Sequence, residues 1–500
     1  MEVKSKSFFF RIWAGIGLIA FLMVWNLPWR FQVNDDEVMM WLVSGLYTGK
    51  PETFAVFIHP VLSWTFSKLY TISPKFPWYS ATWFLIMLLS YLAIIKLIAS
   101  RSIHLIQKKV WALFLLGFFV HFLFFLQFSI VAAFSISAGL SLRLIYREES
   151  QKSWLNLRFS DLFILIGYMI RPEVLILFLI GAVVVNFLVI RRKQLYLGLV
   201  LPLVLSIGGS LAMILWIDRE GLNEFFEINR LRSQVFDHPS LQLHNDDFKT
   251  SDPDLYYFGN GLIDFNRDPK LHQKLETWKK ELDQRRFVNF DMANLFNSLT
   301  KFLLKEYFFV GLLAVFLTFS FLVNWKKALL MSLVLFLGLI LLSPFYLLKV
   351  QIFAIVFLLY FILCLVYLDQ RIGFKNIWIV YILIISGSII FHFISYFQSS
   401  NNIPSGTILT QEIERIQSEG IQEVYLVGSG NLYQEVLYDR PLGFRILGWP
   451  TLLKKNNGYE SSGKKAYLID SNTYFNNVGY FKTEVIKEGT SDLILLTTEK

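Results

Sequence analysis

Long apolar runs constrain the fold of this chain more than any other feature. A helix needs about 20 consecutive, mostly apolar residues to cross a lipid bilayer. Runs of this kind occur near residues 8–28, 78–98, 110–126, 129–146, 159–170, 172–190, 195–217, 303–323, 327–347, 350–368 and 376–396. Only 17 % of the residues are charged, against roughly 25 % in soluble proteins. The sequence therefore predicts an α-helical polytopic membrane protein with about eleven transmembrane helices.

The distribution of lysine and arginine predicts the orientation of these helices. With the N-terminus inside, the inner loops carry Arg101, Lys108 and Lys109, then Arg143, Arg147, Lys152 and Arg158, then Arg191, Arg192 and Lys193, then Lys326 and Lys327, then Arg371 and Lys375. The short outer connections carry few cations, as the positive-inside rule requires. An odd number of helices places the C-terminus outside. The net charge of +9 follows from this topology, so it does not indicate a nucleic-acid partner.

Two loops and the C-terminal tail face outward in this topology. The first loop spans residues 29–77, and its apolar segment 54–72 contains His, Pro and Lys. Making that segment a span would reverse the orientation of the basic loops, so it is predicted to be a helix in the membrane interface. The second loop spans 218–302 and is predicted to be an ordered external subdomain with helix near 270–287.

The tail, residues 397–500, has the composition of a soluble domain. Its segment "TQEIERIQSEG" is typical of a capped amphipathic helix that ends at a glycine, and "VYLV", "KAYLI" and "LILLT" are typical of short strands. The sequence thus predicts two domains. They are a transmembrane domain over residues 1–396 and a small extracytoplasmic soluble α/β domain over residues 397–500.

The densest short acidic cluster, "NDDE", directly follows the first apolar run. It contains Asp35, Asp36 and Glu37, with Trp29 and Phe31 just before it and "VMMWLVSGLY" just after it. A solvated acidic loop is one interpretation. However, the apolar flanks pin the carboxylates at the membrane interface, where partial desolvation and mutual repulsion raise their pKa values. Such a cluster suits a general base, or a divalent cation such as Mg²⁺ or Mn²⁺ held by Asp35 and Asp36.

Cations and a histidine are predicted at the same membrane face. Arg171 interrupts the apolar stretch "LIGYMIRPEVLILFLI" and has Glu173 as its nearest partner, and Lys349 lies at an outer junction between two spans. Each cation has a structural alternative, which is a local ion pair for Arg171 and snorkelling to the headgroups for Lys349. Cations at this depth suit the phosphate of a lipid carrier. Glu173 and His59 in "FIHP" are further candidates for substrate binding, with a packed interfacial histidine as the alternative for His59.

Several enzyme classes are excluded by what the sequence lacks. It has no Walker motif, no G-x-S-x-G and no H-E-x-x-H, and "VGSGN" is not a full G-x-G-x-x-G fingerprint. The single cysteine, Cys364, lies inside an apolar run. An internal disulfide or a cysteine-based metal site is therefore excluded.

In these features the chain resembles the GT-C-type glycosyltransferases, a superfamily of polytopic enzymes that use polyprenyl-phosphate-linked sugars. "VNDDEVMMW" occupies the place of the acidic pair in the first external loop of that superfamily, and "FAVFIHPVLSW" resembles its second interfacial helix. The paired short helices at 110–146 and the large late external loop also fit. More narrowly, the chain is similar to a group of bacterial polytopic membrane proteins in "NDDE…SGLYTGKPE", in "IRPE" and in a tail containing "LGWP".

The resemblance implies transfer of a sugar, with inversion, from a polyprenyl phosphate such as undecaprenyl phosphate. The acceptor would be an envelope glycan, lipid or protein at the outer face of the bacterial cytoplasmic membrane. In this interpretation Asp35 and Asp36, supported by Glu37, act as base or metal ligands, and Arg171 and Lys349 hold the donor phosphate. The late cation is an arginine in many members of the superfamily, whereas this chain has Lys349.

Other functions are compatible with the same topology. A polysaccharide polymerase or ligase would also use polyprenyl-linked sugars, but that class relies more on external arginines than on acids after the first helix. A lipid or solute transporter would be expected to show charges at mid-membrane, broken helices or inverted repeats, and the notable charges here are predicted at one face. A catalytically inactive scaffold that acts through its external tail is a third alternative.

Overall fold

Apolar helices that pack side by side make up most of the molecule. A computed structural model of the 500-residue chain describes residues 2–148, 154–190, 200–265, 268, 270–288, 292–368, 375–400, 406–421, 423–427, 444–452, 465–481, 484–489 and 493–498. Within these residues, nine helices are long and apolar enough to cross a membrane. They are α1 (Glu2–Trp25), α4 (Trp78–Ser100), α5 (Leu105–Phe124), α6 (Phe128–Glu148), α8 (Pro172–Val185) with its extension η1 (Asn186–Ile190), α10 (Val200–Arg219), α17 (Tyr307–Leu342), α18 (Val350–Tyr367) and α19 (Lys375–Ser400). The predicted polytopic membrane class is confirmed.

Helix α17 contains two of the predicted spans. Its backbone leaves the helical conformation at Asn324 (φ −157°, ψ 93°). The hydroxyls of Ser320 and Ser332, on either side of this kink, lie 2.7 Å and 3.0 Å from the same Tyr360 hydroxyl of α18. In a straight helix the two serines would be about 18 Å apart. The helix therefore folds back at Asn324 and provides two antiparallel segments.

Helix α7 (Trp154–Ile170) accounts for the remaining predicted span. It has 17 residues and packs antiparallel to α6, because the Ser160 and Ser135 hydroxyls donate to the carbonyls of Gly139 and Phe163, respectively. Each of the eleven apolar runs thus forms a helix, although residues 195–199 of one run lie outside the described residues.

Close approach of α6 and α7 depends on glycine. A Cβ atom added at Gly139 would lie 2.7 Å from the Ser160 carbonyl oxygen and 2.5 Å from a side-chain carbon of Ile164. A Cβ atom at Gly167 would lie 2.9 Å from the Ala132 carbonyl oxygen. These distances are too short for real Cβ contacts, so the helices pack backbone against backbone, as small residues allow within membranes.

Gly139→Ala is therefore expected to destabilise the protein, by about 1–3 kcal/mol, because overpacking forces the backbones apart. Thermal unfolding in detergent, followed by tryptophan fluorescence, measures the effect. Gly338→Ala in α17 is the matched control, since an added Cβ there has no neighbour within 4 Å. Equal unfolding temperatures for the two variants would contradict the prediction.

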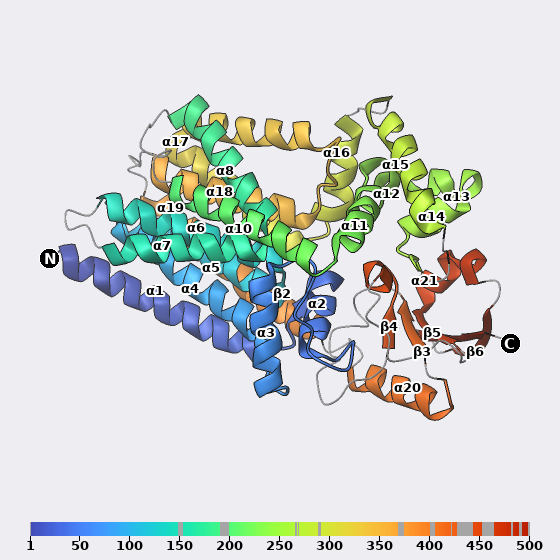
Figure 1. Cartoon of the computed structure of the whole chain (residues 1–500). Coiled ribbons are helices and arrows are strands. Elements are labelled where there is room, and N and C mark those ends of the chain that lie inside the picture. The colour runs from blue at the N-terminus through green and yellow to red at the C-terminus, as the bar shows by residue number, and fades with distance from the viewer. Residues whose placement is uncertain are drawn as a thin grey trace.

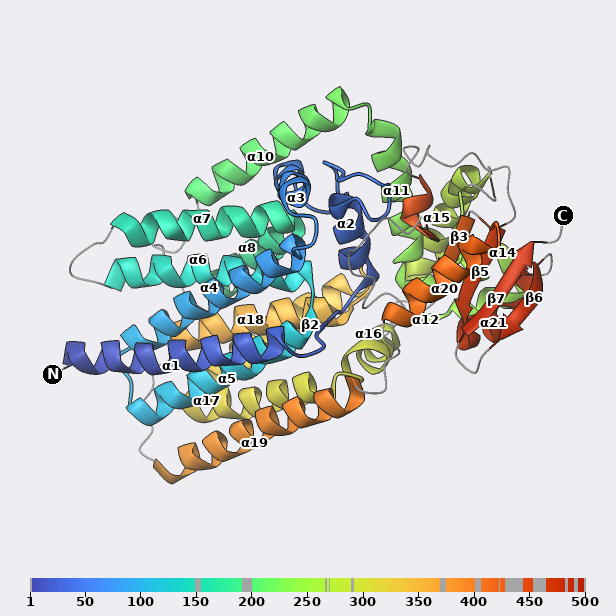
Figure 2. The ribbon, with the colours of Figure 1, turned by 90° about the horizontal axis from the view of Figure 1, so that it is seen from below.

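The two long loops, which are predicted to be external, and the tail gather at one end of the helix bundle, opposite the N-terminus (Figure 1, Figure 2). In the first loop, α2 (Asn34–Ser44) is followed by α3 (Pro60–Ile72). Helix α3 has 13 residues and exposes the large apolar side chains of Val61, Trp64 and Ile72. It is shorter than the apolar segment 54–72 because Pro60 occupies its first turn. A helix too short to span agrees with the predicted interfacial helix, whose position in the interface stays a prediction.

The second loop folds into a helical unit with its own core. Its helices are α11 (Asn223–Phe236), α12 (Pro239–Leu243), η2 (Asn245–Asp247), α13 (Phe248–Ser251), α14 (Pro253–Gly259), α15 (Leu271–Val288), α16 (Met292–Ser298) and η3 (Leu299–Leu303). Val235, Leu241, Leu255, Leu275 and Leu282 are fully buried at its centre. This unit agrees with the predicted ordered subdomain, and α15 matches the helix predicted near 270–287, while the external position of the unit stays a prediction.

The tail contains helix α20 (Gly406–Ser418) and a five-stranded mixed sheet in the order β4-β3-β5-β7-β6. Strands β4, β3 and β5 are parallel, while β7 pairs antiparallel with β5 and β6. The elements are β3 (Glu423–Val427), β4 (Phe444–Ile446), η5 (Trp449–Leu452), β5 (Lys465–Asp470), α21 (Ser471–Asn476), η6 (Val478–Phe481), β6 (Glu484–Gly489) and β7 (Leu493–Thr498). The three predicted strands are confirmed, and the three-residue β4 and the charged β6 were not predicted. The division at residues 396 and 397 stays a prediction, since α19 continues to Ser400.

A two-stranded parallel pairing joins the first external loop to the bundle. Strand β1 (Arg30–Phe31) pairs with β2 (Phe125–Leu126) between α5 and α6. At the opposite end of the bundle, Arg101 and Lys327 donate to carbonyls at the end of α18. The basic residues Lys152, Arg191, Arg192, Lys193 and Arg371 lie outside the described residues. The assignment of this end to the inside of the membrane stays a prediction.

Candidate active site

The acidic cluster forms the first turn of α2 rather than a free loop. Val33 is its extended N-cap residue, and Asp35, Asp36 and Glu37 follow in the first turn. Carboxylates are favoured there because the amino end of a helix carries a partial positive charge. Since successive residues of a helix point about 100° apart, the three side chains enter three different environments.

Asp36 points into the bundle and is fully buried. It accepts a hydrogen bond of 2.9 Å from the Tyr79 hydroxyl, and the Phe128 backbone N–H lies 3.2 Å and 3.3 Å from its two oxygens. Burial raises the pKa of Asp36 well above its ordinary value, and the charge of Asp35 adds to that rise. The two hydrogen bonds and the cation of Arg171 act in the opposite direction. Asp36 therefore anchors α2 to α4 and α6.

Glu37 is also buried, with an exposed fraction of 1 %. Its Oε2 atom has no hydrogen-bond partner in the part of the chain that the structure describes. Burial, followed by the charge of Asp36, raises the pKa of Glu37 well above its ordinary value, while Arg30 lowers it. A protonated side chain at this position avoids an uncompensated buried charge.

The raised pKa of Glu37 predicts a pH-dependent stability. A carboxyl group whose pKa is raised in the folded state contributes stability below its unfolded pKa, and this stability is lost as the pH rises through the folded pKa. Glu37→Gln removes the titration, so the variant is expected to unfold at a higher temperature than wild type at pH 8. If the acid dissociation constant of Glu37 differs tenfold between the folded and unfolded states, the variant gains about 1.4 kcal/mol in its free energy of unfolding relative to wild type at pH 8. This difference should shrink toward pH 5.

Thermal unfolding between pH 5 and pH 9 measures this difference. Glu220→Gln, which changes an exposed acid at the end of α10, is the control. If the difference in unfolding temperature between Glu37→Gln and wild type did not depend on pH, the prediction would be wrong.

Asp35 is half-buried and faces the tail. Its Oδ1 atom accepts a hydrogen bond of 3.0 Å from the indole N–H of Trp449 in η5. It also interacts electrostatically with Arg232 of α11, whose guanidinium is buried and donates to Asn229 (2.9 Å). Burial lowers the pKa of Arg232, and the carboxylates of Asp237 and Asp35 act against this. Among the three acids of the cluster, Asp35 combines partial exposure with a neighbouring cation.

Arg171 is the N-cap residue of α8, and Pro172 occupies the first helical position, as predicted. Its Nε atom lies 3.1 Å from a carboxylate oxygen of Glu173, whose side chain is 67 % exposed. The guanidinium carbon lies 5.2 Å from the ring centre of Phe128 and 5.7 Å from that of Phe57. These distances are those of cation–π contacts. Arg171 also interacts electrostatically with Asp36, so the cation and the acidic turn lie together.

Lys349 precedes α18 and contacts a different part of the site. Its ammonium group lies 2.7 Å from Oδ1 of Asp237, at the end of α11. Burial acts to raise the pKa of Asp237, but Lys349 and Arg232 outweigh it, so this pKa lies below its ordinary value. Because Arg232 interacts with both Asp237 and Asp35, Lys349 is linked to Asp35 through Arg232.

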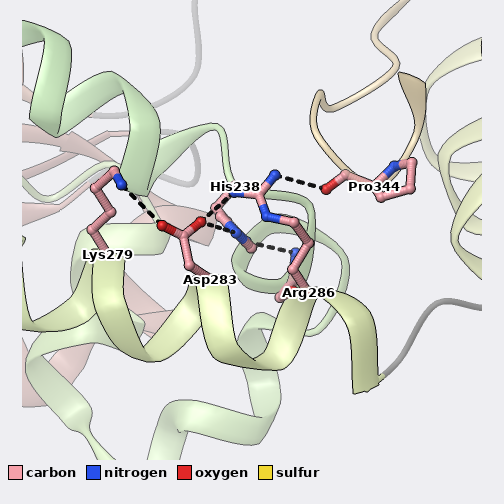
Figure 3. A network of polar contacts seen from close by, with 6 residues as sticks. His238, Lys279, Asp283, Arg286 and Pro344 are labelled. Carbon is pink, nitrogen blue, oxygen red and sulfur yellow. Dashed lines mark hydrogen bonds and ion pairs between the residues drawn. The ribbon is translucent and has the colours of Figure 1, made fainter. Parts of the chain in front are cut away.

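A second network of charges lies next to Asp237 and fixes α15 (Figure 3). Asp283 accepts from Lys279 (2.9 Å) and from Arg286, and its Oδ1 lies 3.6 Å from Nε2 of His238. Arg286 also donates to the Pro344 carbonyl (3.0 Å). Pro344 belongs to the connection between α17 and α18, so this network holds α15 against the segment that leads to Lys349.

His59 caps helix α3. Its Nδ1 atom accepts from the Val61 backbone N–H (3.3 Å), and its Nε2 atom lies 3.5 Å from the Gly209 carbonyl oxygen of α10. Burial lowers the pKa of His59, which favours the neutral ring that this cap requires. Both ring nitrogens thus have partners within the chain, and a role of His59 in substrate binding stays a prediction.

No protein-family model matches the chain, and no curated protein matches it either. Among solved structures, the chain is similar to two crystal structures of ArnT from Cupriavidus metallidurans. The apo state is 12 % identical with a TM-score of 0.42, and the structure bound to undecaprenyl phosphate is 11 % identical with a TM-score of 0.41. Each comparison covers 97 % of this chain and 97 % of the other. A likeness this distant does not assign the chain to a family.

The contacts of Asp36 favour a structural role over metal binding. Both oxygens of Asp36 already accept hydrogen bonds, and a raised pKa disfavours the ionised form that binds a divalent cation. Among the described residues, no group of three or more His, Cys, Asp or Glu residues is arranged to hold a metal ion. A divalent cation held by Asp35 and Asp36 stays a prediction.

Three further residues, Arg232, Asp237 and Trp449, lie at the candidate site. The sequence offered Arg232 only as one of six unranked arginines of the second loop, and it did not single out Asp237 or Trp449. Arg232 had a signal, since Ile228, Leu231, Arg232 and Val235 follow the i, i+3, i+4, i+7 spacing of one helix face. A charged residue within an apolar stripe is a candidate for a buried functional cation. Trp449 had no such signal, because its role depends on a contact with a residue 414 positions away.

Proposed function

We propose that this chain is a membrane glycosyltransferase that moves a sugar from a polyprenyl-phosphate-linked donor to an acceptor hydroxyl. One observation carries the proposal. Asp35, a half-buried carboxylate, interacts electrostatically with the buried cation Arg232 at the end of the helix bundle where the regions predicted to be external gather. Arg171 lies at the same end, close to the neighbouring Asp36. The resemblance of the "NDDE" region to the first external loop of the GT-C superfamily supports this function.

Asp35 is the proposed general base. An acceptor hydroxyl can reach only a carboxylate that is accessible, and Asp36 and Glu37 are both buried. Asp35 removes the hydroxyl proton as the acceptor oxygen attacks the anomeric carbon of the donor. The bond between that carbon and the phosphate oxygen breaks, and its electron pair leaves with the polyprenyl phosphate. Attack opposite the leaving group inverts the anomeric configuration.

The cations of the site are proposed to hold the donor phosphate. A guanidinium binds a phosphate through two parallel hydrogen bonds, and an ammonium binds it as a point charge. Arg171 is the N-cap residue of the membrane helix α8 and Lys349 that of α18. The end of a membrane helix is where the phosphate of a membrane lipid is expected, which supports this role. Arg232 provides a third cation close to the acid. Negative charge that develops on the leaving phosphate is stabilised by these groups.

The outer face of the bacterial cytoplasmic membrane is the proposed location of the reaction. The positive-inside rule, applied to the basic residues at the other end of the bundle, supports an N-terminus inside. In that orientation the three regions around Asp35 face outward. The acceptor is proposed to be an envelope glycan, lipid or protein, reached from the aqueous side of the external loops.

Donor turnover by the purified protein tests this function. The protein in lipid nanodiscs is incubated with a panel of radiolabelled undecaprenyl-phosphate sugars and candidate acceptors, and the released lipid phosphate is measured with and without EDTA. The anomeric configuration of the product, read by NMR, tests inversion. Turnover that survives EDTA supports a mechanism through side chains alone. Flux of a lipid or solute across proteoliposomes, without turnover of any donor, would instead favour a transporter.

A further inference from the structure

A segment of the tail lies directly on the acidic turn. Residues 444–452 are described, and most of their side chains are buried. The Gly448 N–H donates to the Ile263 carbonyl (2.7 Å), and the Phe265 N–H donates to the Thr451 hydroxyl (3.3 Å). Gly448 has a φ of 112°, which favours glycine. This turn fixes the segment between the second external loop and α2.

Trp449 carries this contact to the acid. Only 4 % of the residue is exposed, and its indole N–H donates to Oδ1 of Asp35 at 3.0 Å. A buried indole needs a partner for its single donor. Asp35 is half-exposed and, without this bond, its carboxylate would be free to rotate between staggered conformations. One buried donor therefore selects the orientation of the proposed base.

Phe57 connects Trp449 to the cation. Its ring lies edge-on to the Trp449 ring, with the ring centres 5.4 Å apart, and it stacks on Phe128 with the centres 6.4 Å apart. The Arg171 guanidinium carbon lies 5.7 Å from the centre of the same Phe57 ring. The acid and the cation are thus joined by an unbroken series of contacts through Trp449 and Phe57.

The backbone beside Phe57 is strained. Val56 has a φ of 65° and is 3 % exposed, and the Phe57 N–H donates to the Ala55 carbonyl at 2.7 Å. This geometry is a γ-turn of the rare positive-φ kind, and a β-branched residue seldom adopts it. The Ser63 hydroxyl of α3 accepts from the Ala55 N–H (3.2 Å) and helps to hold the turn. Strain of this kind is concentrated at functional sites.

We propose that the tail completes the active site, with Trp449 as a positioning residue that orients Asp35 and sets its relation to Arg171 through Phe57. The inference rests on the proposed function, because the acid and the cation are those of the proposed sugar transfer. It predicts that removing the indole N–H impairs the chemical step without weakening donor binding.

Kinetics of Trp449→Phe in nanodiscs test the inference. The variant keeps an aromatic ring but loses the donor, so kcat is expected to fall about 10- to 100-fold, as misplacement of a catalytic group does. The KM for the donor should differ from that of wild type by less than about 2-fold, because the substitution does not change the residues proposed to hold the donor phosphate. Phe444→Leu is the matched control. It weakens the contact of the same tail segment with Trp41 (ring centres 5.0 Å apart) but leaves the bond to Asp35. An unchanged kcat in Trp449→Phe, or an equal loss in Phe444→Leu, would overturn the inference.

A second measurement needs no activity. The protein is labelled with 5-fluorotryptophan, and the Trp449 signal among the 14 tryptophans is identified in the ¹⁹F NMR spectrum by its loss in Trp449→Phe. Asp35→Ala, which removes the acceptor, is expected to shift this signal, whereas Glu173→Gln is expected to leave it in place. A Trp449 signal that is unchanged in Asp35→Ala would overturn the inference whether or not a donor is turned over. Absence of donor turnover alone would contradict the proposed function and leave this contact to be judged by its spectrum.

Discussion

Asp35→Asn is expected to lower kcat for sugar transfer by about 10²- to 10⁴-fold, the usual contribution of a general base. Asparagine has the shape of aspartate and can still accept the Trp449 hydrogen bond, but it cannot take a proton from the acceptor. The fold should therefore persist, and the KM for the donor should change little. Initial rates in nanodiscs, with thermal unfolding as a check on folding, measure the effect.

Asp36→Asn is the matched control for this substitution. The Asp36 side chain is buried, and its raised pKa favours the protonated form, so a neutral amide is a close substitute. An amide oxygen can still accept from Tyr79, which preserves the anchor of α2. Most of the activity is therefore expected to remain. Loss of turnover in Asp36→Asn, with near-normal rates in Asp35→Asn, would exchange the roles of the two acids.

Arg171→Ala is expected to raise the KM for the donor by about 10-fold or more, since a hydrogen bond to a charged group contributes about 1.5–3 kcal/mol. The same loss of affinity is expected for undecaprenyl phosphate, which carries the phosphate but no sugar. Binding of this lipid to the purified variant, measured by microscale thermophoresis, separates donor binding from chemistry.

Glu173→Gln should act in the opposite direction. Glu173 is 67 % exposed and lies 3.1 Å from the guanidinium of Arg171, so it competes with a phosphate for the same cation. Removing its charge is expected to lower the KM for the donor. If Arg171→Ala and Glu173→Gln both raised this KM by similar amounts, the pair would be a structural unit and Arg171 would not bind the phosphate.

Hydropathy and charge predicted most of the membrane fold. Apolar runs give helices in a bilayer because every backbone polar group must find a partner within the segment. For the same reason the reversal inside α17 could be predicted, since two runs with Lys326 and Lys327 between them cannot form one straight span. The place of Arg171 before Pro172 was predicted from the restriction that proline imposes on helix starts.

The ranking of the three acids could not be predicted, because it depends on tertiary contacts. Asp35, Asp36 and Glu37 are consecutive and chemically alike in the sequence. Their difference arises when α2 packs with Asp36 toward Tyr79 and Asp35 toward the tail. Similarly, Lys349 was predicted to lie at the acidic end of the bundle, but its partner Asp237 comes from another loop. Pairings of this kind leave no periodic pattern along the chain.

The contact between Asp35 and Trp449 can form only late in biosynthesis. The two residues are separated by 414 positions, so translation at about 5–20 residues per second separates their emergence from the ribosome by roughly 20–80 s. During that interval the acid-bearing helix is already made, while the residue that orients its carboxylate does not yet exist. Under the proposed function, the base stays without this positioning contact until the tail has been made. A polypeptide that ends before Trp449 is therefore expected to turn over the lipid-linked donor no faster than Trp449→Phe.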